Sequence, residues 1–207
     1  RTTLNGEGLQ HEDGHSHIMA GTIPNCVSYD PTFAHEVGVI LHHGLKRMVE
    51  KQENVFFYLT LLNENYAMPG LTAGTEEQII KGMYLCKPGS TSLTPRVQLL
   101  GSGTILRESI AAQELLEQDW GVAADVWSCP SFNELTRDGQ NAERFNLLHQ
   151  LETPQVSFVS QQLANHVGPV IASTDYMKAY AEQIRPFIPK GRTYKVLGTD
   201  GFGRSDF

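Results

Sequence analysis

The sequence predicts an α/β fold in which β-strands alternate with amphipathic helices around a mostly parallel sheet. Apolar runs rich in β-branched and aromatic side chains, each about four to eight residues long, recur along the chain. Between them lie longer stretches in which apolar side chains repeat every three or four positions, as on one face of a helix. Because parallel strands need a helical crossover, this alternation favours a twisted sheet that helices cover on both faces.

The composition agrees with one or two globular domains whose partners are small molecules or proteins. The chain has 207 residues, of which 40% are hydrophobic, and its 16 basic and 23 acidic side chains give a net charge of −7. No basic run marks a binder of nucleic acid or of an anionic membrane. No apolar stretch approaches the roughly 20 residues that span a bilayer, and the start shows no signal segment.

The cysteines indicate a reducing compartment. Cys26, Cys86 and Cys129 are far apart, odd in number and in no C-x-x-C pair, which argues against a disulfide framework. We interpret them as buried free thiols and expect the protein to be cytoplasmic.

The first part of the chain is predicted as a loop, a strand, a helix and a second strand. Residues 1–23 are rich in glycine and show neither helical nor strand periodicity, so they predict a long loop, which in a compact domain is often functional. A short strand at 26–29 precedes Asp30-Pro31-Thr32, which offers turn and cap chemistry for an amphipathic helix over 33–48. The continuous apolar run at 55–62 is typical of a strand buried on both faces.

The middle of the chain predicts a connection between two domains. Glycine, proline and small polar residues gather at 68–75 and again at 87–95. We therefore expect a first domain at 1–70, a connection at 71–92 and a second domain at 93–207.

The second domain continues the alternation of strands and helices. Its Gly101-Ser102-Gly103 follows a strand, but the third glycine of a dinucleotide fingerprint is missing, so a tight strand-to-helix turn is predicted. The predicted strands are 97–100, 124–128, 169–172 and 194–197, and the predicted helices are 105–117, 131–148, 156–165 and 176–188.

The candidate catalytic segment is the glycine-punctuated stretch 6–17, GEGLQHEDGHSH. It holds three histidines and three carboxylates, and folding alone does not require such crowding. Histidine exchanges protons near neutral pH, and the glycines let the backbone approach a ligand closely.

Two other interpretations of this segment stay open. His11, His15 and His17 with a neighbouring carboxylate could hold zinc, as in a metal-dependent hydrolase, although the spacing is not H-E-x-x-H and Gly14 argues against a helix. The segment could also be a solvated polar loop. Four other histidines, which we assign to packing, are His42, His43, His149 and His166.

Segments that together cover essentially the whole chain resemble the homodimeric, bacterial-type pyruvate dehydrogenases. They are RTTLNGEGLQHEDGHSHI (1–18), TIPNCVSYDP (22–31), KQENVFFYLTLLNENY (51–66), VQLLGSGTILR (97–107), FNELTRDGQ (132–140), ASTDYMK (172–178) and LGTDGFGRSD (197–206).

The resemblance implies a transketolase-like fold and an internal fragment of a longer enzyme. Residues 1–70 would be the C-terminal part of a middle domain that contacts the thiamin pyrimidine, and residues 93–207 the first part of a transketolase-like C-terminal domain. The complete enzyme would use thiamin diphosphate and Mg²⁺, held mainly by parts absent from this chain, so the fragment alone should be inactive.

The resemblance also implies the reaction and its partners. The complete enzyme would decarboxylate pyruvate oxidatively and acetylate lipoyl-lysine reductively. Its partners would be pyruvate, the lipoyl domain of dihydrolipoyl acetyltransferase and a second copy of itself in a homodimer. The rival interpretation is a fragment that serves only assembly or dimerisation.

By the same resemblance, Glu7 and His11 are the expected catalytic residues. The more distant transketolases share an E-D-G-x-T-H element, which at 12–17 makes Asp13, His15 and His17 candidates for the substrate pocket. The resemblance does not decide between His15 and His17, and it assigns no metal ligand and no cofactor-binding residue within this chain.

Overall fold

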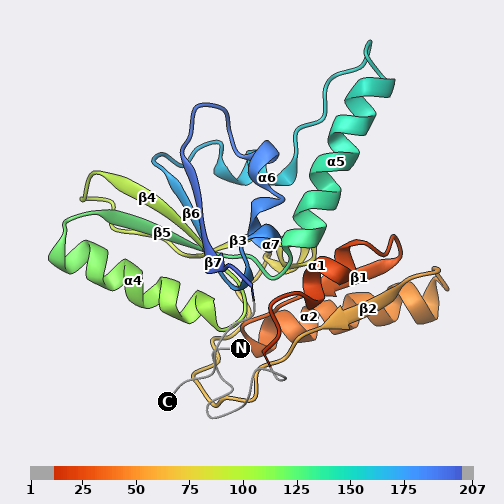
Figure 1. Ribbon diagram of the computed structural model, residues 1–207, viewed down its shortest axis with the longest axis horizontal. Helices are drawn as coiled ribbons and strands as arrows, with labels where there is room; N and C mark the ends of the chain where they lie inside the picture. Colours follow the sequence, from red (N-terminus) through yellow and green to blue (C-terminus); the bar gives the residue numbers. More distant parts are fainter. Residues whose placement is uncertain (1–11, 202–207) are drawn as a thin grey trace.

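A computed structural model of the protein describes residues 12–201 and confirms the predicted α/β fold with a mostly parallel sheet. One sheet has two parallel strands, β1 and β2, and the other has five strands in the order β3-β5-β4-β6-β7. In the larger sheet every strand is parallel to its neighbour except β3, which runs antiparallel to β5. In Figure 1 the smaller sheet and its helix α2 lie together on one side of the larger sheet.

The first part of the chain builds the smaller sheet. Strand β1 (Cys26–Tyr29) pairs in parallel with β2 (Phe56–Leu59), and helix α2 (Ala34–Leu45), prolonged by a π-helical turn at Lys46–Glu50, connects them. The core between these elements and α3 contains Val27, Tyr29, Ile40, Ile79 and Tyr84. The predicted strand at 26–29 and the predicted helix over 33–48 are thus confirmed.

The predicted loop at 1–23 is wrong where helix α1 (Ser16–Gly21) forms. This helix has fewer than two turns, which is too short for a repeat of apolar side chains to show in the sequence. Residues 1–11 of the predicted loop lie outside the described residues.

Strand β2 is not buried on both faces, contrary to the prediction. Phe56 is 44% exposed and the other three residues of the strand are half-buried. A continuous apolar run is typical of a strand inside a sheet that is covered on both faces. Within residues 12–201, however, β2 pairs only with β1 and lies at the edge of a two-stranded sheet, so part of its surface stays exposed.

The start of α2 is capped by a different residue from the one predicted. The carboxylate of Glu36, in the first turn, accepts the backbone N–H of Thr32 at 2.6 Å and of Phe33 at 3.0 Å. Asp30 does not cap this helix; its side chain is used elsewhere, as described below.

Two elements form inside the stretch predicted as a connection. Helix α3 (Glu76–Lys81) ends at Gly82, which has a left-handed φ of 98°, and strand β3 (Tyr84–Lys87) joins the edge of the larger sheet. The sequence did not predict either element. The limits proposed for the two domains remain a prediction.

The rest of the chain follows the predicted alternation. The helix expected from 176 starts three residues later, because Tyr176 and Met177 prolong the preceding strand. The elements are β4 (Arg96–Gly101), α4 (Ile105–Asp119), β5 (Ala123–Ser128), α5 (Phe132–Leu148), α6 (Phe158–Leu163), β6 (Val170–Met177), α7 (Ala179–Glu182), a 3₁₀ turn at Arg185–Phe187 and β7 (Tyr194–Thr199).

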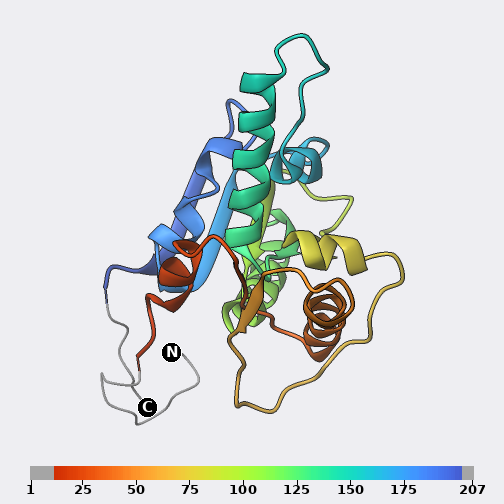
Figure 2. The same ribbon diagram turned by 90° about the vertical axis from the view of Figure 1, so that its right-hand side faces the viewer.

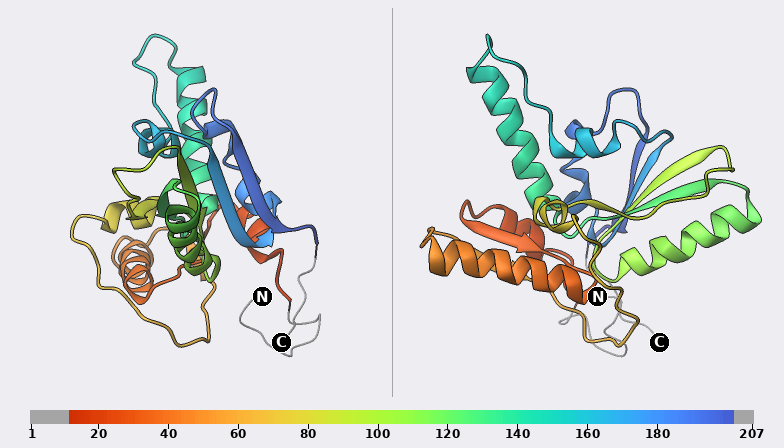
Figure 3. Two further views of the ribbon diagram at one scale, coloured as in Figure 1. Left: turned by 90° about the vertical axis from the view of Figure 1, so that its left-hand side faces the viewer. Right: turned by 180° about the vertical axis from the view of Figure 1, so that it is seen from behind.

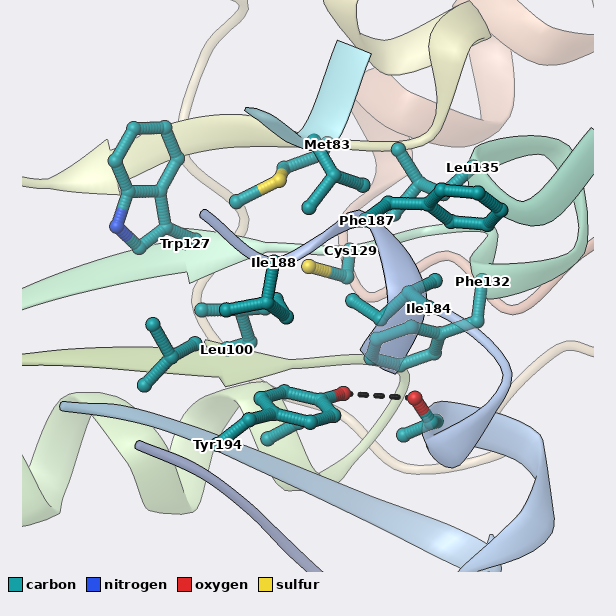
Figure 4. Close-up of a cluster of buried hydrophobic side chains, with 14 of the residues drawn as sticks. Met83, Leu100, Trp127, Cys129, Phe132, Leu135, Ile184, Phe187, Ile188 and Tyr194 are labelled. Atoms are coloured by element: carbon teal, nitrogen blue, oxygen red, sulfur yellow. Dashed lines mark hydrogen bonds between the residues drawn. The ribbon is translucent and has the colours of Figure 1, made fainter. Parts of the chain in front are cut away.

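Helices cover both faces of the larger sheet, as predicted. On one face, Leu99 and Val126 pack with Leu106 of α4, and on the other, Leu100 and Trp127 pack with the helices that follow β5. Figure 3 shows α4 on one side of the strands and α5 on the other. Figure 4 shows the second core, from Met83, Trp127 and Phe132 to Tyr194.

The state of the cysteines and the length of the helices can be compared with what the sequence predicts. All three cysteines are free; Cys26 and Cys129 are buried and Cys86 is partly exposed, so the prediction of buried thiols holds for two of them. No helix among residues 12–201 is long and apolar enough to cross a membrane.

Candidate active site at the carboxyl ends of the strands

The carboxyl ends of parallel strands from both sheets meet at one place. Asp30 directly follows β1, Thr60 directly follows β2 and Ser102 directly follows β4, and hydrogen bonds join these three side chains. In α/β proteins, ligands bind outside the carboxyl ends of parallel strands. The fold therefore marks this meeting point as the candidate site.

The element at 12–17, which contains the predicted pocket residues, lies against this meeting point. The backbone N–H of Met177 at the end of β6 donates to the Gly14 carbonyl at 3.0 Å. A Cβ on Gly14 would stand 2.9 Å from the Gly201 carbonyl oxygen, so only glycine allows this approach. Figure 2 shows α1, which follows the element, beside the end of β6 and α7.

The Asp13 carboxylate hydrogen-bonds to the residues at the start of helix α1. Its Oδ1 accepts the backbone N–H of His15 at 3.1 Å and of Ser16 at 2.9 Å, and its Oδ2 accepts the Ser16 hydroxyl. These are the bonds that a short polar side chain makes when it starts a helix. Asp13 thus holds the first turn of α1 in place next to the two histidines.

His17 is fully buried at the centre of the candidate site. Its Nε2 lies 2.9 Å from the Thr60 hydroxyl. Three tyrosine rings surround the imidazole: Tyr180 stacks on it with centroids 5.1 Å apart, and Tyr176 and Tyr58 present their edges at 4.9 and 5.4 Å. The ring is therefore held in one orientation by packing and by a hydrogen bond.

His15 has a different environment. It is half-buried at the N-cap of α1, and its carbonyl accepts the N–H of Ile18 and of Met19, each at 3.0 Å. The structure thus separates a rigid, enclosed His17 from a more accessible His15. Which of the two meets a ligand remains a prediction.

Glu7 and His11, the expected catalytic residues, lie outside the described residues. The described element begins at Glu12, which directly follows His11 and is 7% exposed.

Asp30 is the buried carboxylate of the site. It is fully buried, and its two oxygens accept the Thr60 hydroxyl at 2.6 Å and the Ser102 hydroxyl at 3.1 Å. Its backbone carbonyl accepts the N–H of Gly103 at 3.0 Å. The Gly101-Ser102-Gly103 turn, which the sequence predicts to be structural, is the segment that holds this carboxylate.

Helix α5 fixes the other side of the site. The Asn133 side-chain amide donates to the His17 carbonyl at 2.7 Å and to the Ser28 hydroxyl oxygen at 2.6 Å. Gln183 donates to the Asn133 oxygen at 2.7 Å, which orients the amide. The backbone of His17 is thus bonded to the second part of the chain.

A second buried carboxylate, Glu36, joins the two parts of the chain farther from His17. It accepts the Tyr84 hydroxyl at 2.8 Å and the Ser128 hydroxyl at 2.5 Å. Burial, followed by the nearby Glu36 charge, raises the pKa of Tyr84 well above its ordinary value, so this phenol stays a hydrogen-bond donor. The seam between the two parts is therefore polar and fully bonded at this point.

The sequence analysis missed several residues that enclose His17. Asp30 was assigned to a turn, and Tyr176 and Tyr180 were placed on one helix, although Tyr176 belongs to β6. The available signal was position: Asp30 and Thr60 each directly follow a predicted strand, where site residues of parallel sheets are found.

The described residues offer no ready metal site. Residues 12–201 contain no group of three or more histidine, cysteine or carboxylate side chains placed to hold a metal ion. The zinc interpretation also requires His11, which lies outside this range.

Two of the histidines assigned to packing, His166 and His149, have structural partners, whereas His42 is exposed. His166 lies near the amino ends of the strands, where its Nδ1 is 3.2 Å from Asp125 and its ring meets Trp127 at 4.7 Å. Asp125 is also paired with Arg96 at 2.6 Å. His149 stacks on Phe145 at 4.3 Å.

Two family models match this chain. A model of the pyruvate dehydrogenase E1 component middle domain matches residues 1–69, and a model of the transketolase-like TK C-terminal domain matches residues 82–207.

Curated relatives align with the whole chain at high identity. The pyruvate dehydrogenase E1 components of Cupriavidus necator, Pseudomonas aeruginosa and Escherichia coli K12 are 63%, 60% and 59% identical to it. In each case all of this chain aligns with 23% of the relative, so the chain spans about a quarter of the length of these proteins.

Solved transketolases share the fold. The enzyme from Campylobacter jejuni superposes with a TM-score of 0.67 at 18% identity, over 99% of this chain and 26% of that one. A transketolase mutant from Pichia stipitis gives 0.61 at 16% identity, over 99% and 25% of the two chains. At such identities the likeness shows the fold alone.

Proposed function

This chain belongs to the pyruvate dehydrogenase E1 family, and we propose that it forms part of the active centre of a thiamin-diphosphate-dependent pyruvate dehydrogenase. The reaction would be the oxidative decarboxylation of pyruvate with reductive acetylation of lipoyl-lysine. One observation carries the proposal: the element at 12–17 lies where the carboxyl ends of strands from both sheets meet, and it holds a buried, oriented imidazole there. Ligands of α/β proteins bind at such a place.

The proposed tasks of the chain are to bind and orient the 2-oxo acid and to move protons at its carbonyl oxygen. Glu7 and His11 are the catalytic residues in this proposal, because an imidazole exchanges protons near neutral pH and a carboxylate can accept or return a proton beside it. His17 and His15 line the pocket that receives the substrate, and Asp13 keeps their backbone in place.

The cofactor is held mainly outside the described residues. Thiamin diphosphate would supply the electron sink for decarboxylation. Residues 12–201 contain no group of three or more histidine, cysteine or carboxylate side chains placed to hold a metal ion. In this proposal Mg²⁺ and the diphosphate are bound mainly by parts of the complete enzyme that this chain lacks.

The partners follow from the same assignment. Pyruvate is the proposed substrate, the lipoyl domain of dihydrolipoyl acetyltransferase the proposed acceptor, and a second copy the proposed subunit partner. A net charge of −7 without a basic run gives no sign of nucleic acid as a partner.

The proposal is tested by comparing the 207-residue chain with the longer polypeptide of its relatives' length. The longer protein should release CO₂ from pyruvate and acetylate an isolated lipoyl domain, and elemental analysis should find Mg²⁺ or Ca²⁺ and no stoichiometric transition metal. The 207-residue chain should show no Mg²⁺-dependent binding of thiamin diphosphate by calorimetry. Failure of the longer protein to act on pyruvate, or one zinc ion per chain, would overturn the assignment.

A further inference from the structure

A chain of hydrogen bonds leads from the buried imidazole through the seam between the two sheets. His17 Nε2 is 2.9 Å from Thr60 Oγ1, and Thr60 Oγ1 is 2.6 Å from Asp30 Oδ1. The other oxygen of Asp30 accepts the Ser102 hydroxyl at 3.1 Å. Each of these residues follows a different strand or belongs to the 12–17 element, so the chain exists only in the folded protein.

The direction of these bonds follows from counting protons. The Thr60 hydroxyl has one proton, and its short bond to Asp30 uses it. The other acceptor that the described residues offer this hydroxyl, the Tyr29 carbonyl, lies at 3.5 Å, at the limit of a hydrogen bond. The contact at 2.9 Å with His17 can then be a hydrogen bond only if the imidazole donates.

Asp30 is suited to accept rather than donate. Its two oxygens accept the hydroxyl groups of Thr60 and Ser102, one each. The turn at Gly103, with φ of 51°, brings the backbone so close that a Cβ there would stand 2.5 Å from Asp30 Oδ2. The carboxylate is thus fixed in position by its surroundings.

We propose that Thr60 and Asp30 are positioning residues that fix the tautomer of His17. Nε2 carries a hydrogen and donates it to Thr60, which leaves Nδ1 as the unprotonated nitrogen of the neutral imidazole. The tyrosine rings on three sides preserve the assignment, because a flipped ring would place a carbon against Thr60 and lose the bond.

The importance of the tautomer for turnover rests on the proposed function. A histidine that lines the pocket can accept a hydrogen bond or a proton from pyruvate only with an unprotonated nitrogen, and the relay makes that nitrogen Nδ1. The tautomer itself is a property of this chain and can be measured without any assay of activity.

The test uses ¹⁵N-histidine NMR on the 207-residue chain, with the His17 signals identified by their loss in His17→Gln. In the unsubstituted protein above neutral pH, the His17 Nε2 should be protonated and Nδ1 should not. Thr60→Ser keeps the hydroxyl and should keep this pattern. Thr60→Val keeps the shape but removes the acceptor, so the hydrogen should move to Nδ1, at least in part.

Two results would overturn the proposal. One is a His17 that carries its hydrogen on Nδ1 in the unsubstituted chain, which would mean that the relay runs in the opposite direction. The other is an unchanged pattern in Thr60→Val. If that variant fails to fold, the unsubstituted chain and Thr60→Ser still decide the question.

A kinetic comparison in the full-length enzyme separates this proposal from the proposed function. Thr60→Val should lower pyruvate turnover by at least about tenfold, as loss of an orienting partner usually does, and Thr60→Ser should retain most of it. An inactive parent enzyme would refute the proposed function and leave the NMR result to judge the relay. An active parent with an equally active Thr60→Val variant would refute the positioning role.

Discussion

Hydrogen bonds link two histidines of this chain to a buried carboxylate, one through a threonine and one directly, at opposite ends of the strands. His17 reaches Asp30 through Thr60 at the carboxyl ends, where both sheets meet. His166 bonds directly to Asp125 near the amino ends, at 3.2 Å. A histidine beside a carboxylate is therefore not by itself a sign of function.

The surroundings separate the two clusters. Asp125 already has a cation, Arg96, at 2.6 Å, and it accepts the Gly89 N–H and the Gln98 amide, so neighbouring groups around the larger sheet compensate its charge. Asp30 accepts the hydroxyl groups of Thr60 and Ser102, which come from segments after different strands. The first cluster stabilises a fold, while the second positions a side chain where strands end.

The largest expected effect is a loss of pyruvate turnover that occurs only when a histidine near the carboxyl ends of the strands is replaced. In the full-length enzyme, His11→Ala should lower pyruvate turnover by about a hundredfold or more, because it removes an acid-base group, while the melting temperature stays unchanged. His166→Ala serves as the control and should leave turnover largely intact. Equal behaviour of the two variants would show that the segment at 6–17 is structural.

The next effect should appear in stability at the amino ends. Arg96→Met removes the cation from Asp125, whose side chain is only 5% exposed, and should cost about 3 kcal/mol of unfolding free energy, measured by urea denaturation. Turnover of the full-length enzyme should persist at temperatures where the variant is folded. A loss of turnover without a loss of stability would mean that the amino ends of the strands, and not the carboxyl ends, contribute to catalysis.

A glycine pair sharpens the comparison at the carboxyl ends. Gly103 and Gly121 have similar left-handed φ angles, 51° and 63°, but a Cβ on Gly103 would stand 2.5 Å from Asp30, whereas Gly121 has open space around it. Gly121→Ala should cost about 1 kcal/mol from backbone strain, and Gly103→Ala about 2 kcal/mol more from the clash. Equal costs in denaturation would mean that Asp30 is not held tightly.

The smallest effect concerns acid stability. Burial raises the pKa of Asp125, but hydrogen bonds from Gly89, Gln98 and His166 and the charge of Arg96 outweigh it, so the pKa lies below its ordinary value. A lowered pKa stabilises the fold above the unfolded value of about 3.9, and this contribution is lost as pH falls through the folded pKa.

Asp125→Asn should therefore be less stable than the parent chain at neutral pH. The difference should stay constant down to about pH 5 and shrink below about pH 4, as measured by denaturation at each pH. A difference that grows toward acid pH would contradict the sign of the pKa shift.

Local sequence patterns predicted most of the larger sheet correctly. Strands and helices of that sheet are long enough to repeat their periodicity, and the apolar runs at 97–100 and 124–128 match β4 and β5 within a residue or two. Helix α1 and strand β3 were not predicted, because α1 follows a glycine-rich polar segment and β3 runs directly into the proline- and glycine-containing stretch at 87–95.

The candidate site was only partly predictable. The crowding of histidines and carboxylates pointed to the segment at 6–17, because folding does not require it. The enclosure of His17 by Thr60, Tyr176 and Tyr180 depends on contacts between residues more than 40 positions apart, which no local pattern records. Such partners follow only from the topology that brings the strand ends together.

The central claim is that the segment around 6–17 receives the 2-oxo acid at the carboxyl ends of the strands. A crystal structure of the full-length enzyme with thiamin diphosphate and an unreactive phosphonate analogue of pyruvate tests this claim most directly. We expect the analogue within hydrogen-bond distance of His11 or of a side chain of the 12–17 element, on the side of the sheet where Asp30 and Thr60 lie. An analogue bound elsewhere, with the segment at 6–17 remote from it, would contradict the claim.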